Sequence, residues 1–409
     1  MSESKKHHFV PQSILRRFTR SDAPDSLYVY DKKRDVVHPS SVLNAGMENG
    51  FNTVVIDGKR INFEAEFNDL DGAMAGVQKR LVEARTIAPL DDADRLVLAD
   101  TAAVQLLRTK LFRTTMPSVL DSILSEFTRV GLVEGELPVM DEQAARAMAR
   151  EALHEREQQR DILAAKDLLL IEPEPGTSFW ISDNPVVRYN PLPYGDTGLS
   201  SPGVEVYWPI AADLALGFMC PTFRRRVEDG FALGARLAEP VRTQCANLRT
   251  AFTDGIPTTL GRGGTTAFLN ELQVRSSSRF IYSSNDDFSL ARKILAADPT
   301  LRSVASMVTV GRIGEGPPPR TNMPPGLQLV VFGREDHHMI PLISYEDVEW
   351  GFDATFEHAA LLDMLMADQP WQEVRVFENG VERRGMRKIK ITAQRGADRQ
   401  HISVRNLLA

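Results

Sequence analysis

The chain has 409 residues, 43% of them hydrophobic and 25% charged, a balance that is ordinary for a globular protein with a substantial core. The net charge of −7 argues against a broadly basic nucleic-acid binder, but a local basic cleft is compatible with it, because charge acts over about 10 Å at moderate salt. No run of about 18 apolar residues occurs, the first residues are polar, and only two cysteines are present, so we expect no membrane span, no secretory signal and no disulfide framework. A bacterial-type cytoplasm is the simplest location for such a chain.

Two adjacent histidines followed by a short amphipathic helix are predicted at the start of the chain. Pro11 disfavours a helical conformation for the residue before it and suits the first turn of a helix, so His7 and His8 should lie in an extended segment. The two imidazoles then point to opposite sides of the backbone, and only one of them can readily face a site while the other packs or orients it. The positive end of the helix, with Arg16 about one turn further along, is a candidate place for a phosphate or another anion.

A hairpin and a helix are predicted next. Residues 27–31 alternate as a strand does, and residues 36–38 return after a polar turn. Over residues 62–81 apolar side chains recur at three- and four-residue spacings, which predicts a helix. Glu66 and Asp71 are acidic positions near its start; they are either ligands for a cation or solvated charges that stabilise the helix dipole.

A second helix is predicted over residues 92–113, with Pro117 breaking or restarting the helix that follows. Gln105 lies among apolar neighbours, so its amide must find hydrogen bonds, because burial without them costs about 1–3 kcal/mol. Arg108, one turn further on, could anchor an anion through its planar guanidinium, or it could form an internal pair with an acid that ties helices together. Residues 141–170 predict one long, highly charged helix.

Ser182, Asp183 and Asn184 form a polar corner between two short apolar strands. Pro185 holds Asn184 extended, while Ser182 and Asp183 can bond to nearby backbone N–H groups. An acid and an amide fixed at a strand end suit a metal or substrate site, because the corner is rigid. The alternative is an Asx turn that only shapes the corner.

The remaining segments predict an α+β fold, with several helices packed on a small mixed or antiparallel sheet. Residues 204–210 and 214–218 read as paired strands, and the glycine-rich stretch 261–264 lacks a Walker lysine and is predicted to be a loop. Glycine and proline between residues 311 and 325 mark a boundary between a core domain (1–310) and a small α+β C-terminal domain (326–409). In the second domain we expect a strand over 327–332, a helix over 352–366 and a hairpin from 374 to 391.

Three motifs of this chain resemble a known family. The opening His7-His8-x-x-Pro11-Gln12, with its Leu-Arg-x-Phe continuation, is similar to the start of the domain of unknown function 4238 (DUF4238) family. Gln105-x-x-Arg108-Thr109 and Ser182-Asp183-Asn184-Pro185-Val186 resemble internal motifs of the same family, with Ile181 in place of a threonine. The family's usual Phe-Tyr is replaced here by Phe51-Asn52. The resemblance covers roughly residues 5–290 and implies no established activity.

The first functional hypothesis is a metal-dependent phosphodiesterase, most simply a nuclease that uses Mg²⁺ or Mn²⁺. An imidazole can ligate a metal or activate water near neutral pH, and carboxylates are hard oxygen ligands. The catalytic candidates are His7, His8, Gln12 and Asp183. The metal candidates are His8, Glu66, Asp71 and Asp183. The candidates for binding substrate are Arg16, Gln105, Arg108, Ser182 and Asn184.

Other functions fit the same residues. The polar motifs could form a buried network that fixes the fold of a non-catalytic module, with the C-terminal domain recruiting a protein partner. The chain could also be an enzyme acting on a small nucleotide or another anion, which its acidic surface tolerates better than long DNA. An HNH nuclease is a third alternative, although only His38 and Asn44 could stand for its later residues. Each catalytic hypothesis requires the three motifs to surround one open hollow.

Overall fold

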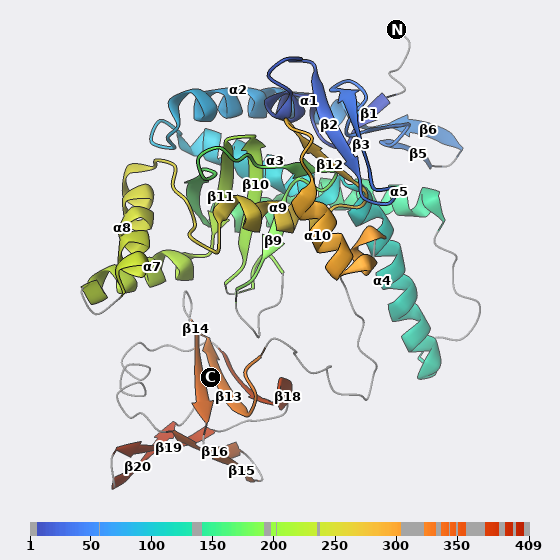
Figure 1. Ribbon diagram of the computed structural model, residues 1–409. Coiled ribbons are helices and arrows are strands. Elements are labelled where there is room, and N and C mark those ends of the chain that lie inside the picture. Colours follow the sequence, from blue (N-terminus) through green and yellow to red (C-terminus); the bar gives the residue numbers. More distant parts are fainter. Residues whose placement is uncertain are drawn as a thin grey trace. The chain divides into compact units, whose positions relative to one another are not determined.

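The computed structural model describes residues 6–56, 58–132, 141–191, 198–201, 203–234, 238–303, 323–332, 337–342, 344–348, 351–356, 373–383, 389–395 and 398–404 (Figure 1). The chain forms two compact units. Unit 1 comprises Met1–Tyr189 and Glu205–Val310, and unit 2 comprises Asn190–Val204 and Gly311–Ala409. Unit 2 therefore includes Asn190–Val204, which the predicted division assigns to the core domain (1–310).

Unit 1 is built around two four-stranded antiparallel sheets, so the predicted α+β class is confirmed (Figure 1). The first has the order β7-β11-β10-β9, and the second has the order β3-β2-β12-β8. Two-stranded sheets β1-β4 and β5-β6 lie beside them. The bounds are β1 (Lys6–His8), β2 (Ser26–Asp31), β3 (Val36–Ser41), β4 (Met47–Asn49), β5 (Thr53–Ile56), β6 (Lys59–Asn62), β7 (Asp167–Ile171), β8 (Ile181–Ser182), β9 (Val187–Tyr189), β10 (Glu205–Ala211), β11 (Leu214–Met219) and β12 (Phe280–Ser283).

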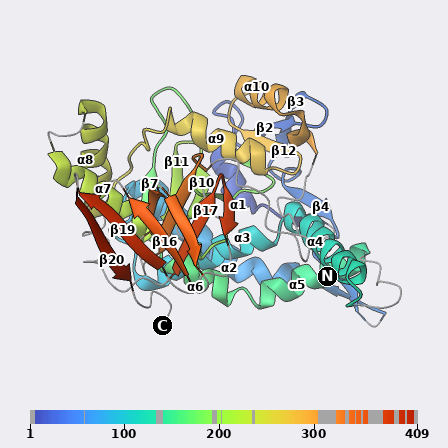
Figure 2. The ribbon, with the colours of Figure 1, turned by 90° about the horizontal axis from the view of Figure 1, so that it is seen from below.

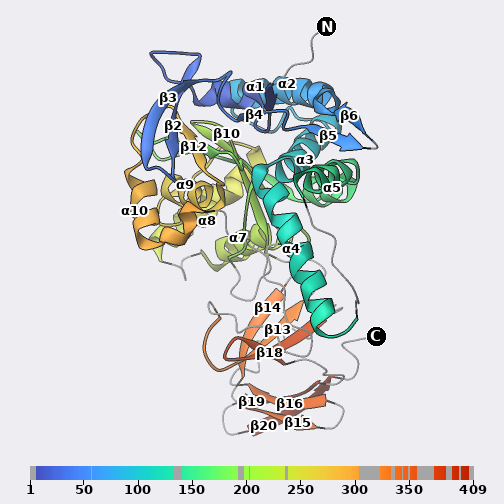
Figure 3. The same cartoon turned by 90° about the vertical axis from the view of Figure 1, so that its right-hand side faces the viewer.

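Helices cover these sheets. Strands β10 and β11 are buried along their whole length, which explains their nearly continuous apolar sequence. Figure 2 shows α7 and α8 beside each other at one side of unit 1, and Figure 3 shows α4 projecting from its body. The bounds are α1 (Gln12–Leu15), α2 (Asn68–Ala84), α3 (Asp92–Leu107), α4 (Lys110–Arg129), α5 (Glu142–His154), α6 (Glu157–Ala164), α7 (Pro221–Leu233), α8 (Glu239–Asp254), α9 (Thr265–Ser276) and α10 (Ser289–Ala297).

Two predicted helices are divided in the structure. The expected helix over 92–113 ends at Leu107, because Thr109 is extended and its hydroxyl accepts a hydrogen bond from the Phe112 N–H (3.2 Å), which starts α4 instead. Pro117 lies inside α4 and does not break it. The expected helix over 141–170 is replaced by α5, α6 and β7, because the apolar end of that segment pairs with β11.

The predicted hairpin over residues 27–38 is confirmed by β2 and β3, and the predicted strand pair by β10 and β11. The expected helix over 62–81 begins later: Asn62 ends β6, a 3₁₀ turn covers Glu64–Phe67, and α2 follows. None of the helices in the described part of the chain is long and apolar enough to cross a membrane.

Unit 2 contains two further four-stranded sheets, β14-β13-β17-β18 and β15-β16-β19-β20. The predicted helix over 352–366 is wrong at its start, where β16 pairs with β15 and β19; the rest lies outside the described residues. The expected hairpin turn is present, but β17 pairs with β18, while β19 belongs to the other sheet. The bounds are β13 (Leu327–Phe332), β14 (His337–Leu342), β15 (Ser344–Val348), β16 (Gly351–Phe356), β17 (Glu373–Glu378), β18 (Val381–Arg383), β19 (Ile389–Arg395) and β20 (Asp398–Val404).

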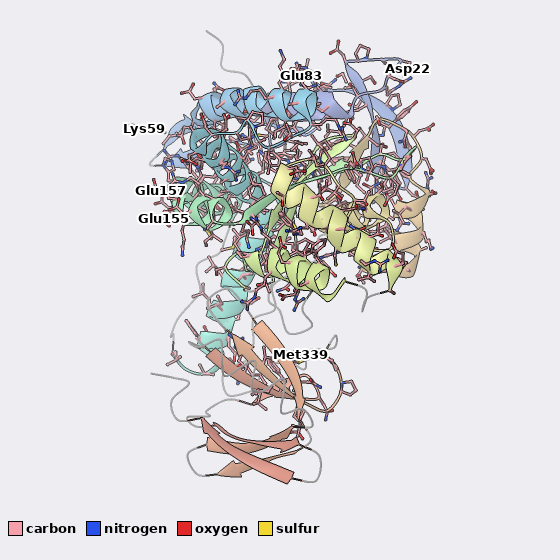
Figure 4. All side chains as sticks on the ribbon, turned by 90° about the vertical axis from the view of Figure 1, so that its left-hand side faces the viewer. Asp22, Lys59, Glu83, Glu155, Glu157 and Met339 are labelled. Atoms are coloured by element: carbon pink, nitrogen blue, oxygen red, sulfur yellow. The ribbon has the colours of Figure 1, made fainter. Side chains whose placement is uncertain are left out.

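Polar side chains dominate the described surface of unit 1. Figure 4 shows Lys59, Glu83, Glu155 and Glu157 pointing outward from it. Exposed charges of this kind are solvated, whereas polar groups that the fold buries need specific partners.

Candidate functional site

The two histidines lie on β1, which pairs with β4 so that His7 is opposite Glu48. His7 is 1% exposed, and its Nδ1 accepts a hydrogen bond from the Asn52 backbone N–H (2.8 Å). His8 is half-buried, and its backbone N–H donates to Glu64 Oε1 (3.2 Å). The two imidazoles therefore have different neighbours, as an extended backbone requires.

Burial favours the neutral form of the His8 imidazole. Burial lowers the pKa of His8 below its usual value, and the nearby Glu64 charge only partly opposes this effect. Within the described residues, Nε2 of His8 is buried and has no hydrogen-bond partner. His8 therefore offers an unprotonated, unoccupied nitrogen or an available N–H, depending on its tautomer.

A glycine anchors the residues that follow the two histidines. Gly46 has a φ of +59°, and its carbonyl accepts hydrogen bonds from the Phe9 (2.9 Å) and Val10 (3.2 Å) N–H groups. A Cβ atom at this position would lie 3.0 Å from the Val10 Cβ. Both the conformation and the close approach therefore favour glycine. The Gly46 N–H donates to the Tyr282 hydroxyl (3.2 Å), which ties the histidine segment to β12.

Asn52 connects His7 to a buried arginine. Its side-chain oxygen accepts a hydrogen bond from Arg113 Nη2 (2.8 Å), and its Nδ2 donates to Glu64. Arg113 Nη1 donates to the Phe51 carbonyl, and its guanidinium carbon lies 3.4 Å from the centroid of the Phe51 ring. The histidine strand, the Phe51-Asn52 turn and α4 are thus one polar unit, and Asn52 takes the place where the family usually has a tyrosine.

Arg113 lines a cavity of about 400 Å³, which we call the α4–α5 cavity. Its walls come from β4 and the turn after it, from the first two turns of α4, and from the start of α5. The charged lining residues are Lys110, Arg113, Arg146, Glu48, Asp141 and Glu142, and Phe51 and Pro117 supply apolar surface. Lys110, Arg113 and Arg146 are not among the residues predicted from the sequence. The pattern that could have indicated the first two is a pair of cations about one turn apart just after the Thr109 cap.

Most charges around the cavity have direct partners, but among the described residues no carboxylate forms a hydrogen bond or an ion pair with Arg113. Lys110 forms an ion pair with Glu48, and Arg146 Nη2 forms one with Glu142 (2.6 Å). Asp141 accepts a hydrogen bond from the Ala144 N–H (2.8 Å) and caps α5.

Arg113 is only 8% exposed, and within the described residues its hydrogen bonds go to neutral oxygens while its Nε has no partner. Burial, together with the nearby Arg146 charge, lowers the pKa of Arg113 to about 9, although the charges of Glu48, Glu142 and Glu64 partly oppose this effect. The group therefore remains positive at neutral pH.

Gln105 and Arg108 form a closed network. Arg108 is 1% exposed and binds Asp71 through both Nη atoms (3.2 and 2.8 Å), with its guanidinium carbon 4.9 Å from the Phe67 centroid. With its amide oriented to satisfy both ends, Gln105 accepts from Arg108 Nη2 (2.6 Å) and Nε (2.7 Å) and donates to the Phe9 carbonyl (3.2 Å). Arg108 therefore forms the internal pair with an acid that was one of its two predicted roles. Together with Gln105, this pair ties α2, α3 and the histidine segment together.

Three other candidates lie at the surface of unit 1. Glu66 is 43% exposed and forms ion pairs with Arg150 (3.6 Å) and His154 (3.4 Å) on α5. Gln12 accepts a hydrogen bond from Arg16 Nη2 (3.1 Å), one helical turn away. None of Glu66, Gln12 and Arg16 lines the α4–α5 cavity.

The 182–184 corner is buried and fully bonded. The Asp183 carboxylate is 0% exposed and accepts hydrogen bonds from the backbone N–H groups of Ser278 (2.7 Å), Arg279 (2.8 Å) and Phe280 (3.0 Å). Burial raises the pKa of Asp183, although these three bonds favour its charged form. Lys32 is the nearby cation; burial lowers its pKa to about 8, and its ammonium donates to the Val274 (3.3 Å) and Ser277 carbonyls.

Ser182 and Asn184 also bond within the fold. Ser182 Oγ contacts Gln273 Oε1 (2.7 Å) and accepts the Asn184 N–H (3.2 Å), which is the local turn considered for this motif. Asn184 Nδ2 donates to the Ser276 carbonyl (3.2 Å). The corner thus fixes the connection between α9 and β12.

The α4–α5 cavity is lined by residues other than the predicted site residues. The α4–α5 cavity is lined by residues next to the histidine strand, and neither Arg108 nor Asp183 is among them. In the described ranges, no group of three or more His, Cys, Asp and Glu side chains is placed to share a metal ion. What the fold does bring together is His7, Asn52 and Arg113.

The comparisons with known proteins agree with the motifs. No curated protein and no solved structure matches the chain. The model of the family described as "Protein of unknown function (DUF4238)" matches residues 6–287, a range that includes all three motifs and the α4–α5 cavity. The chain therefore belongs to the DUF4238 family.

Proposed function

We propose that this chain binds, and acts on, a small ligand carrying a phosphate or carboxylate group, and that the ligand occupies the α4–α5 cavity. The observation that carries the proposal is the buried Arg113 guanidinium, which lines the cavity and has no acidic partner in the described part of the chain. Burial lowers the pKa of this guanidinium although the charges of Glu48, Glu142 and Glu64 act in the opposite direction, so an anion that bonds to it directly would stabilise its charged form further.

The geometry of Arg113 suits such an anion. Its Nη atoms are anchored by Phe51 and Asn52, while Nε is left without a partner in the described structure. A fixed guanidinium donates to a phosphate or carboxylate with little further loss of freedom. Lys110, whose partner Glu48 is itself partly exposed, lies one turn away on α4 and adds a second cation.

The size and charge of the site favour a small ligand. A cavity of about 400 Å³ falls within the range of roughly 300–1,000 Å³ that is common for small-molecule sites. The lining also contains three acids, and the net charge of the chain is −7, both of which oppose a long polyanion. A mononucleotide or a compact phosphorylated metabolite is therefore the ligand class that we propose.

The test is a calorimetric titration of the full chain with inorganic phosphate, pyrophosphate, AMP and citrate. We expect saturable binding of at least one of them, weakened at least tenfold in Arg113→Gln. Arg156→Gln is the matched control, because Arg156 pairs with Asp100 (2.7 and 3.1 Å) and lies outside the cavity lining. No binding of any anion, or equal weakening in both variants, would contradict the proposal.

A metal-dependent phosphodiesterase is the second candidate, and the unpartnered Nε2 of His8 favours it. His8 would hold Mg²⁺ or Mn²⁺ or move a proton, and Glu64 is the carboxylate that the fold brings beside it. Wild type and His8→Ala should be incubated with DNA, RNA and nucleotides, with and without either metal. Metal-dependent cleavage that His8→Ala lacks would support this function, and equal activity in the variant would remove His8 from it.

A further inference from the structure

A second polar cluster lies in the sheet β7-β11-β10-β9, at the edge where β9 ends and β10 begins (Figure 1). Tyr189 and Glu205 are register partners across these strands. Glu205 is only 1% exposed, and its Oε2 accepts a hydrogen bond from the Tyr207 hydroxyl (2.5 Å). Because a buried carboxylate is stabilised by a counter-charge, the position beside Glu205 favours a cation.

Aromatic rings surround the position of that cation. The guanidinium carbon of Arg262 lies 5.3 Å from the ring centroid of Tyr189 on β9, 5.6 Å from that of Phe223 on α7 and 5.3 Å from that of Phe268 on α9. Arg262 Nη2 donates to Glu205 Oε1 (2.7 Å). Three rings around one cation, with a carboxylate beside it, form the arrangement that binds guanidinium and alkylammonium groups; we call these residues the aromatic cage.

The occupant of the cage comes from a glycine-rich loop, in which the Gly263 N–H donates to the Gly261 carbonyl (3.1 Å). Arg262 is flanked by Gly261, Gly263 and Gly264, whose φ angles are +66°, +66° and +108°. Its side chain is 23% exposed, so the cage is open to solvent at its position, and its Nη1 has no hydrogen-bond partner within the described residues. Glycines on both sides permit the loop to take other conformations, so Arg262 could leave without disturbing the strands and helices that carry the rings.

We propose that the aromatic cage is a binding site for a small guanidinium or alkylammonium compound, and that Arg262 occupies it until such a compound displaces it. A displacing cation would replace the ion pair with Glu205 and the contacts with the rings, so the buried carboxylate would never be left alone. Because the ligand must compete with Arg262, its apparent affinity is lower than the affinity of the empty cage.

The test uses methylguanidinium as the ligand and methylurea as its neutral analogue, titrated calorimetrically into the full chain. We expect saturable binding of methylguanidinium to wild type, at least tenfold tighter binding to Arg262→Ala, and no binding of methylurea. Arg262→Lys keeps the ion pair but fits the cage less well, so its affinity for methylguanidinium should lie between those of wild type and Arg262→Ala. This variant replaces Arg262→Ala in the test if Arg262→Ala does not fold. Glu205→Gln should abolish binding.

Arg249→Ala is the matched control, because Arg249 also pairs with an acid, Glu228 (2.9 Å), and lies over a ring, Phe231 (4.3 Å), but stands at the surface. It should bind methylguanidinium as wild type does. If the Arg262 variants bind and wild type does not, Arg262 is a permanent part of the fold and the proposal is overturned. The same holds if Arg262→Ala binds no better than Arg249→Ala.

Discussion

The α4–α5 cavity and the 182–184 corner each contain a buried charge, but the fold treats the two charges differently. Around Asp183 three backbone N–H groups and a nearby lysine satisfy the carboxylate, and no solvent reaches it. Around Arg113 the described partners are neutral, one nitrogen is unbonded, and a cavity adjoins the group. A satisfied, closed charge stabilises a fold, whereas an incompletely bonded charge beside a cavity is the arrangement on which the proposed ligand site rests.

The largest expected effect concerns stability at the corner. In Asp183→Asn one acceptor becomes an NH₂ group that faces backbone donors, and Lys32 loses its counter-charge, so we expect the free energy of unfolding to fall by about 3–5 kcal/mol. Denaturant unfolding of the full chain measures the change. Asp161→Asn, at a position 65% exposed beside Arg160, should change the midpoint very little. If the two variants unfold alike, the corner does not hold the fold as described.

The second effect should appear in both affinity and stability. His7→Ala removes the acceptor of the Asn52 N–H, which costs about 1–3 kcal/mol for a buried donor left unbonded. Because Asn52 also holds Arg113, we expect anion affinity to fall several-fold as well. Thermal unfolding and calorimetry check the two parts separately.

His154→Ala is the control for that comparison, since this histidine is 47% exposed and lies on α5 beside Glu66. It should affect neither quantity appreciably. A destabilised His7→Ala protein with unchanged anion affinity would show that the histidine strand supports the fold without positioning Arg113.

The smallest effect is a pH dependence. Burial alone would raise the pKa of Glu174, but hydrogen bonds from the Thr266 hydroxyl and from the backbone N–H groups of Thr266 and Thr265 together lower it to about 2, from an ordinary value of 4.5. The folded pKa lies below the unfolded one. The carboxylate therefore stabilises the fold above about pH 4.5, and this contribution is lost as the pH falls towards 2.

The Glu174→Gln variant should therefore have a lower unfolding temperature than wild type at pH 6. The difference between the two unfolding temperatures should be smaller at pH 3. Melting curves at the two pH values measure it. A difference that is constant with pH would mean that the charge of Glu174, which caps the start of α9, contributes nothing.

Local chemistry made part of this structure predictable from the sequence. The hairpin of β2 and β3, the short helix after Pro11 and the turn at Ser182 follow from alternation, proline and side-chain turns, and the family follows from the motifs. The division between α3 and α4 was also signalled by Thr109, a good N-cap, but the apolar spacing that continues beyond it hid the signal.

Distant pairing was not predictable. Residues 167–171 become a strand because β11 lies beside them, and their short apolar run after a charged helical segment is compatible with either a helix or a strand. The surroundings of Arg113 likewise depend on Phe51 and Asn52, which are about sixty positions earlier in the chain. They also depend on α5, which lines the same cavity and follows α4 in the chain. A single sequence shows the cation but not that its hydrogen bonds in the described structure go to neutral oxygens.

The central claim is tested most directly by the dissociation constant for pyrophosphate in wild type, Arg113→Lys and Arg113→Gln under one salt concentration. If Arg113 is the cation that receives the anion, affinity should fall stepwise, modestly in the lysine variant, which keeps the charge, and at least tenfold in the glutamine variant. Equal dissociation constants in all three proteins, each shown to be folded, would contradict the assignment of the α4–α5 cavity as the anion site.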